Sequence, residues 1–250
     1  ILPKGNRRIS ANPITNGGEN PKDLILPDIR KYAVEVKSPG SKKTQDMLEL
    51  SAYIRDVFKL NKDNHNYRIF SPDEAMSNRL YHVFEQENRD FNAKIVENDE
   101  FLSADGKVMD SYLSEHACEG WLVCNSLPWR KPISSLNILL TSNVWQQDHN
   151  GYTHQEPGFL DHVANKKADI VRIYLPPDAN CLISCYDHCQ ASKNYINVIV
   201  ASKHPSYQWL DMESAIKHCT KGVSIWDWAC TNKGKEPDIV IACAGDTPTI

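Results

Sequence analysis

The chain has 250 residues and a mass of 28.4 kDa, which fits one large domain or two small ones. Its 28 Lys and Arg residues against 32 Asp and Glu residues give a net charge of −4, which argues against a basic nucleic-acid-binding surface and a polybasic membrane anchor. Mean hydropathy is −0.50, and no apolar run approaches the ~18 residues of a bilayer-spanning helix. We therefore expect a globular protein with no nucleic-acid or membrane partner.

The two ends of the sequence indicate a piece of a longer chain. The first residues contain neither an initiator Met nor the apolar segment of a signal peptide. Near the other end, residues 239–244 predict a β-strand that begins just before the sequence stops.

Composition along the chain predicts four segments. Residues 1–45 are rich in Pro, Gly, Asn and Lys, which is typical of an inter-domain linker that lies over a surface. Residues 46–230 carry the periodic apolar patterns of one α/β domain. The polar residues 231–237 predict a second linker, and residues 238–250 the truncated start of a C-terminal domain.

The first half of the predicted domain is mostly helical. Apolar residues at helical spacing predict a helix over residues 45–60. Residues 67–70 predict a short strand that ends at Ser71-Pro72-Asp73, and residues 78–87 and 112–123 predict two further helices.

The second half alternates between strands and helices. The predicted strands are 136–140, 170–175 and 196–201, and the predicted helices are 157–164, 178–192 and 211–221. Asp178 is expected to cap the second of these helices, and Gly222 to end the third. Because the strands are almost continuously apolar, the pattern predicts a mostly parallel sheet with helices on both faces.

The cysteines indicate packing rather than a disulfide framework. There are eight, and no C-x-x-C pair occurs. Cys181, Cys185 and Cys189 are spaced four apart inside a predicted helix, so they share one stripe and suit a buried face. A cluster-binding loop is the alternative. Free thiols predict a reducing compartment, with the cytoplasm as the default.

Ligands of such sheets bind beyond the carboxyl ends of the strands, so polar residues there are candidates for function. The loop 144–158 holds His149 and His154, which suit proton transfer, although a solvated capping loop or a zinc site lacking a third ligand are alternatives. Lys203 follows the strand 196–201 and is either a phosphate-binding charge or an ordinary surface lysine. No glycine-rich phosphate motif and no G-x-S-x-G turn occurs in the sequence.

Several motifs closely resemble phosphoketolase. The run 128–137 followed by 147–155 (Gln-Asp-His-Asn-Gly-Tyr-Thr-His-Gln) carries the resemblance most specifically. The other matching segments are 8–18, 71–74, 77–80, 175–180, 226–229 and 244–249, so the resemblance covers essentially the whole chain.

The resemblance implies a thiamine-diphosphate enzyme similar to transketolase. Phosphoketolases cleave xylulose 5-phosphate, often also fructose 6-phosphate, with inorganic phosphate to give acetyl phosphate and an aldose phosphate. This chain resembles their linker, their middle pyrimidine-binding domain and the first strand of their last domain. The resemblance therefore implies that Mg²⁺ and the diphosphate are held by a domain absent here, that the isolated chain is inactive, and that the enzyme is a homodimer.

The resemblance also implies roles for individual residues. Glu115 matches the glutamate that contacts N1′ of the cofactor's aminopyrimidine, and burial would raise the pKa of such a carboxyl group. His149 and His154 match histidines placed for proton transfer. The positions that match residues binding the sugar phosphate or inorganic phosphate are Ser77, Arg130, Gln147, Asn150 and Lys203. No metal ligand is expected in this chain.

The sequence departs from the family pattern in two places. A few dozen family residues are missing between Val123 and Leu127, and Gln146 stands where the family usually has Arg. A missing stretch there would remove part of the substrate pocket, so a degenerate, non-catalytic binding module is the alternative to an enzyme. A transketolase-type transfer is disfavoured by the loop 147–154.

Overall fold

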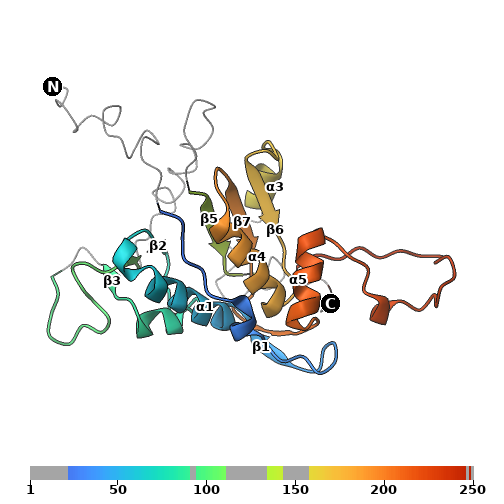
Figure 1. Ribbon diagram of the computed structural model, residues 1–250, viewed down its shortest axis with the longest axis horizontal. Helices are drawn as coiled ribbons and strands as arrows, with labels where there is room; N and C mark the ends of the chain where they lie inside the picture. Colours follow the sequence, from blue (N-terminus) through green and yellow to red (C-terminus); the bar gives the residue numbers. More distant parts are fainter. Residues whose placement is uncertain (1–21, 91–93, 111–133, 143–157, 246–247, 249–250) are drawn as a thin grey trace.

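The computed structural model describes residues 22–90, 94–110, 134–142, 158–245 and 248. Within these residues, three parallel strands form the central sheet in the order β5 (Leu136–Leu140), β7 (Ile196–Val200) and β6 (Val171–Tyr174). All five residues of β7 are buried, because it lies between two strands and contains apolar residues on both faces. The sheet therefore has the parallel arrangement that the sequence predicts (Figure 1).

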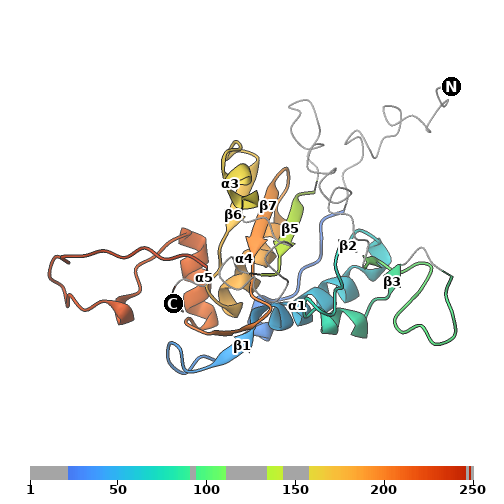
Figure 2. The same ribbon diagram turned by 180° about the vertical axis from the view of Figure 1, so that it is seen from behind.

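Helices flank this sheet, as Figures 1 and 2 show from opposite sides. The helices are α1 (Asp46–Leu60), α3 (Phe159–Ala164), α4 (Ala179–Ala191) and α5 (Met212–Lys221). Helix α4 contacts α1, α5 and β7, while α3 contacts β6. The predicted α/β fold, consistent with a transketolase-like pyrimidine-binding domain, is confirmed.

The main core lies between α1, α4 and the sheet. Met47, Leu50 and Val57 project from one face of α1 and are fully buried. They share one cluster with Leu182 of α4 and Ile199 of β7. Their spacing along α1 is that of an amphipathic helix, so burial of this face holds the helix against the rest of the domain.

Short elements complete the described part. Two-residue strands β2 (Ile69–Phe70), β4 (Val108–Met109) and β3 (Arg89–Asp90) form a small parallel sheet in that order. Strands β1 (Lys43–Gln45) and β8 (Pro205–Tyr207) pair antiparallel. The 3₁₀-helices are η3 (Ile29–Tyr32), η4 (Lys62–Asn64), η5 (Tyr81–Glu85) and η9 (Asp227–Ala229).

The prediction of a helix over 78–87 is wrong. This stretch contains only the short 3₁₀-helix η5. Arg79 takes the left-handed backbone conformation, with a φ of 67°, and an α-helix cannot continue through such a residue. The side chain of Asn78 also bonds back to the turn before it, which favours a turn over a helix start.

The prediction of a strand over 239–244 is also wrong. These residues form no strand, and Ile239, Val240 and Ile241 are each about 80% exposed. A β-strand needs a hydrogen-bonding neighbour, and no strand of the described residues pairs with this segment.

The described part of the predicted linker, residues 22–45, lies on the domain. Helix η3 contacts both α1 and α4. The side chain of Asn180 accepts a hydrogen bond from the Val34 amide at 2.8 Å and donates one to the Val34 carbonyl at 2.9 Å. The domain boundaries themselves stay a prediction.

The remaining predicted elements divide into confirmed and undescribed ones. Helices α1, α4 and α5 are confirmed, and α4 and α5 have Asp178 and Asp211 as N-caps. Cys181 and Cys189 are buried on α4 as predicted, while Cys185 is half-buried. The predicted helix 112–123 lies outside the described residues, as does Pro157 at the start of the predicted helix 157–164.

Candidate functional site

The candidate site lies at the carboxyl edge of the central sheet. Strands β5 and β7 end side by side, with Leu140 paired to Val200. Thr141 directly follows β5, and Lys203 follows β7 by three residues. Both contact Asn78, which belongs to the segment after β2. Three chain segments distant in sequence therefore meet at the edge where ligands of parallel sheets bind.

Asn78 connects these segments through its side-chain amide. Its Oδ1 accepts hydrogen bonds from Lys203 Nζ, at 3.3 Å, and from the hydroxyl of Thr141. Its Nδ2 donates to Asp73 Oδ2 at 3.1 Å and to the Glu74 carbonyl at 2.7 Å. Because both ends of the amide are engaged, and the residue is only 6% exposed, its orientation is fixed.

Lys203 is a buried cation at this edge. The residue is only 5% exposed. Burial lowers the pKa of its ammonium group, the carboxylate of Asp73 partly offsets that effect, and the charge of Arg79 adds to it. A poorly hydrated cation beside a second cation gains from an incoming anion, so the pair suits a phosphate group better than a neutral ligand.

Arg79 and Ser77 lie next to this lysine contact in the sequence. Arg79 Nη1 donates to the Ser77 carbonyl at 3.1 Å, and within the described residues its buried Nε has no hydrogen-bond partner. The Ser77 hydroxyl donates to the Glu74 carbonyl at 2.9 Å. The unsatisfied Nε is a donor that an anion could engage, and guanidinium groups match phosphate oxygens in geometry.

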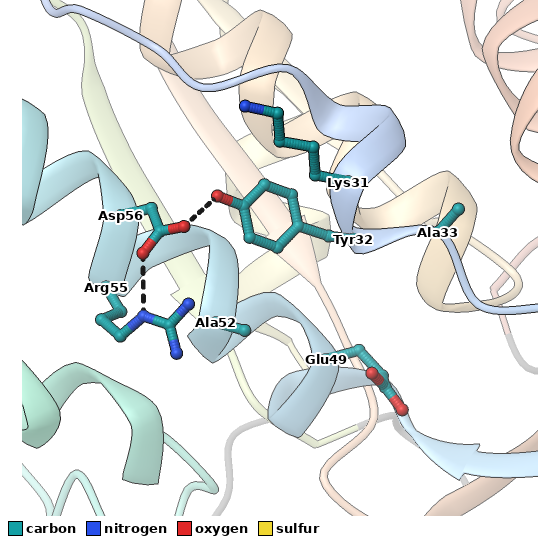
Figure 3. A pocket seen from close by; sticks show the side chains of 7 residues that line it. All are labelled: Lys31, Tyr32, Ala33, Glu49, Ala52, Arg55 and Asp56. Atoms are coloured by element: carbon teal, nitrogen blue, oxygen red, sulfur yellow. Dashed lines mark hydrogen bonds and ion pairs between the residues drawn. The ribbon is translucent and has the colours of Figure 1, made fainter.

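Away from this edge, a hollow of about 360 Å³ lies between η3 and α1 (Figure 3). Asp56 accepts hydrogen bonds there from the Tyr32 hydroxyl at 2.5 Å and from Arg55 Nε at 2.8 Å. Arg55 also donates to Glu85 at 2.8 Å. These charged groups already satisfy one another, so this hollow makes a weaker binding site than the sheet edge.

Of the predicted site residues, the structure places Ser77 and Lys203 at one edge, with Asn78 between them. The other six lie outside the described residues: Glu115, Arg130, Gln147, His149, Asn150 and His154. Their roles, and those of Ser77 and Lys203, stay predictions.

Sequence reasoning missed three residues of this edge, Asn78, Arg79 and Thr141. Thr141 had a signal, because it directly follows a predicted strand at the end where ligands bind. Asn78 and Arg79 stand beside Ser77 in a motif that was recognised, but they were placed at the start of a helix that does not form.

The part of the chain that the structure describes contains neither a metal-binding cluster nor a membrane-spanning helix. Among those residues, no group of three or more His, Cys, Asp or Glu side chains is arranged to hold a metal ion. No described helix is both long and apolar enough to cross a membrane.

Comparison with known families gives a specific match. A sequence model described as D-xylulose 5-phosphate/D-fructose 6-phosphate phosphoketolase matches residues 48–126 and 123–192, more than half of the chain. The chain belongs to the phosphoketolase family. A second model, described as XFP C-terminal domain, matches residues 203–250, which include Lys203 and α5.

Curated relatives in the phosphoketolase family resemble the chain over its whole length. "Probable phosphoketolase" of Clostridium acetobutylicum is 52% identical over 285 residues, which cover 100% of this chain and 36% of the relative. "Probable phosphoketolase 1" of Rhizobium meliloti is 50% identical over 284 residues, with the same shares covered. "Probable phosphoketolase" of Nitrosomonas europaea is 48% identical, again over 36% of its length. The chain thus spans about a third of these relatives.

The match is interrupted where the sequence lacks residues of the family pattern. The phosphoketolase model matches in two segments that meet at residues 123–126. The alignment with the Clostridium relative has 285 positions, 35 more than the 250 residues of this chain. Both findings agree with a missing stretch between Val123 and Leu127.

Proposed function

We propose that this chain forms part of a thiamine-diphosphate-dependent phosphoketolase and supplies residues that bind its phosphorylated substrates. The reaction is phosphorolytic cleavage of xylulose 5-phosphate, fructose 6-phosphate or both to acetyl phosphate and an aldose phosphate, a carbon–carbon lyase reaction. The observation that supports it most directly is the buried Lys203 at the carboxyl edge of the sheet, positioned by Asn78 and accompanied by Arg79.

The described residues are suited to phosphate binding. Lys203 and Arg79 supply positive charge and donors, while Asn78 and Thr141 supply oriented polar groups. Sugar phosphates and inorganic phosphate, the proposed ligands, are both anions with several acceptor oxygens. We assign Ser77, Arg130, Gln147 and Asn150 to the same phosphate-binding role on the basis of the family motifs.

The cofactor assignment depends on family membership and on Glu115. When bound, thiamine diphosphate supplies the carbon nucleophile and holds the electrons released on carbon–carbon cleavage. Glu115 would hold the aminopyrimidine, and His149 and His154 would move protons at the substrate. We assign Mg²⁺ and the diphosphate to another domain, as the family resemblance implies.

Further parts of the proposal concern assembly and location. We assign a homodimer on the basis of the family resemblance alone. We assign a cytoplasmic location because the six cysteines of the described part are free thiols, as a reducing compartment favours. The non-catalytic binding module remains the second candidate, because the family match is interrupted at residues 123–126. Acetyl phosphate formation distinguishes the two functions.

The phosphate-binding role of Lys203 can be tested on the chain itself. Titration calorimetry with inorganic phosphate and with xylulose 5-phosphate should show binding to the unmodified chain. Lys203→Gln keeps a donor for Asn78 but loses the charge, and should weaken phosphate binding about tenfold or more. Lys217→Gln, an exposed site on α5, loses the same charge and should leave binding unchanged. Equal affinity of the two variants would refute the role of Lys203.

A further inference from the structure

A buried carboxylate contacts the turn that carries Asn78. Asp110 directly follows strand β4, at the carboxyl end of the small sheet, and is only 4% exposed. Its Oδ1 accepts a hydrogen bond from the Ala75 amide at 2.7 Å. Its Oδ2 forms an ion pair with Arg89, whose Nε lies 2.7 Å away. The proposed function uses neither Asp110 nor Arg89.

Arg89 holds this carboxylate from a fixed position. Its backbone amide donates to the Phe101 carbonyl at 2.6 Å. Its guanidinium group lies over the Phe84 ring, 4.6 Å from the ring centre. A Cβ atom at Gly106 would lie 2.4 Å from the Arg89 carbonyl oxygen, so only glycine permits this close approach of the two backbones. The positive charge of Arg89 therefore compensates the buried negative charge of Asp110 in a defined geometry.

Ala75 begins the turn that Leu80 closes. The Ala75 carbonyl accepts a hydrogen bond from the Leu80 amide at 3.0 Å, and Ala75 itself is fully buried. Asp110 engages the amide of Ala75 and Leu80 engages its carbonyl, so both sides of this residue are held. Asn78 and Arg79 lie inside the closed turn, and their positions at the sheet edge therefore depend on Ala75.

These contacts connect Asp110 to Lys203 by a continuous path. Asp110 holds the Ala75 amide, and the turn from Ala75 places Asn78. The Oδ1 atom of Asn78 then accepts a hydrogen bond from Lys203 Nζ at 3.3 Å. A lysine ammonium group is a point charge on a flexible stem, so its position depends on the acceptor that holds it. Release of the turn would leave Lys203 present but no longer directed.

We propose that Asp110 is a positioning residue of the phosphate site. Paired with Arg89, it holds the turn 75–80 so that Asn78 directs the ammonium group of Lys203 at the carboxyl edge of the central sheet. The inference rests on the proposed phosphate-binding function of that edge. Asp110 acts through the turn and does not itself bind phosphate, and its ion pair with Arg89 keeps its negative charge from opposing an anion there.

Titration calorimetry with inorganic phosphate tests this role. Asp110→Ala removes the acceptor of the Ala75 amide and should weaken phosphate binding about tenfold. Asp110→Asn keeps an acceptor oxygen for that amide, so its affinity should stay within about threefold of that of the unmodified chain. Asp178→Asn makes the same change at a buried aspartate that caps α4 instead, and it should leave phosphate affinity unchanged. Circular dichroism confirms that each variant is folded at the temperature of the titration.

A double-mutant cycle separates positioning from a general loss of stability. If Asp110 acts through Asn78, its removal should matter little once Asn78 has gone. In a chain that already carries Asn78→Ala, adding Asp110→Ala should weaken phosphate binding less than about twofold. Independent structural roles would instead give losses that multiply.

Acetylation of lysines tests the positioning in the absence of phosphate. With limiting acetic anhydride and peptide mapping by mass spectrometry, Lys203 of the unmodified chain should react more slowly than the exposed Lys217. Asp110→Ala should raise the rate at Lys203 about fivefold or more, because the released turn no longer protects it, and should leave the rate at Lys217 unchanged.

Four results would each overturn the proposal. They are unchanged phosphate affinity in Asp110→Ala, no recovery of affinity in Asp110→Asn, losses that multiply in the cycle, and an unchanged acetylation rate at Lys203. Absence of phosphate binding by the unmodified chain would contradict the proposed function instead. The acetylation rates would then decide by themselves whether Asp110 positions Lys203.

Discussion

Two buried polar residues at the carboxyl end of the central sheet hold chain segments together. Asn78 joins the segment after β2 to Lys203 and Thr141. Asp46, the first residue of α1, accepts hydrogen bonds from the Ser206 hydroxyl at 2.9 Å and from Gln208 Nε2 at 2.8 Å. An apolar residue could not replace Asn78 or Asp46, because each forms hydrogen bonds with several polar groups that are buried with it.

Asp46 makes stability depend on pH. Burial raises the pKa of its carboxyl group to about 8, although its two hydrogen-bond donors oppose the shift. In the unfolded chain the pKa of this group is near 4. Between about pH 4 and 8, the Asp46 carboxyl group is therefore protonated in the native state and ionised in the unfolded state. Raising the pH through this window should lower the free energy of unfolding, by at most about 1.4 kcal/mol per pH unit from this group.

Asp46→Asn isolates this effect. Its amide has nearly the same shape and keeps an oxygen for Gln208, but it cannot ionise. Urea unfolding at several pH values should show the variant gaining stability relative to the unmodified chain as pH rises from 4 to 8. A difference between the two proteins that stays constant across this range would show that Asp46 does not titrate as described.

At the scale of elements, two helices begin with the same residue type in different surroundings. Asp178 caps α4 and is fully buried, and its carboxylate accepts from the amides of Cys181, Trp209 and Leu210 at 2.8 to 3.1 Å. Asp211 caps α5 at an exposed position and accepts from the Ser214 amide at 3.0 Å. Asp178 therefore links the start of α4 to the loop at residues 209–210, whereas the hydrogen bond of Asp211 stays within α5.

Substitution of the two capping residues should lower the free energy of unfolding by different amounts. Asp211→Ala should cost about 1 kcal/mol, as for an ordinary exposed cap. Asp178→Ala leaves two buried amides and one partly buried amide without an acceptor and should cost about 3 kcal/mol or more. Asp178→Asn keeps one acceptor oxygen and should fall between them. Chemical unfolding measures all three, and equal losses at the two positions would contradict the structural role of Asp178.

How much of the fold the sequence predicts depends on the length of each element. The apolar run of β5 predicts its bounds correctly, because five consecutive apolar-rich residues between polar ones leave little ambiguity. Strand β2 (Ile69–Phe70) lies within the predicted strand 67–70. Strands β3 and β4 have two residues each, too few for any periodicity to be detected, and they form through pairing between distant segments. The lack of such pairing also explains why residues 239–244 form no strand, because no strand of the described residues pairs with this apolar segment.

The site was predictable only where a strand end or a motif marked it. Lys203 and Ser77 are predicted in that way, and Lys203 contacts Asn78, the residue that follows Ser77; their roles stay predictions. The bridging role of Asn78 follows from tertiary contacts, which a short polar motif does not encode. Arg79 was not predicted as a site residue, because the sequence favoured a helix at this position. Its positive φ depends on the folded backbone and cannot be deduced from the sequence.

At the scale of the whole molecule, the chain forms an α/β domain with a buried apolar core and belongs to the phosphoketolase family. It spans 36% of the length of its curated relatives, so catalysis is assigned to the protein made from the complete reading frame that encodes it. The isolated chain should bind phosphate but form no acetyl phosphate, because Mg²⁺ and the diphosphate are assigned to another domain. Turnover by the isolated chain would contradict that division of roles.

Acetyl phosphate formation by that complete protein tests the central claim most directly. With xylulose 5-phosphate, inorganic phosphate, Mg²⁺ and thiamine diphosphate, the unmodified protein should produce acetyl phosphate, detected as its hydroxamate. Glu115→Ala, with thiamine diphosphate still present, should abolish product, while the control Lys217→Gln should retain full activity. No product from the unmodified protein would favour the non-catalytic binding module, and undiminished product from Glu115→Ala would contradict the assigned cofactor contact.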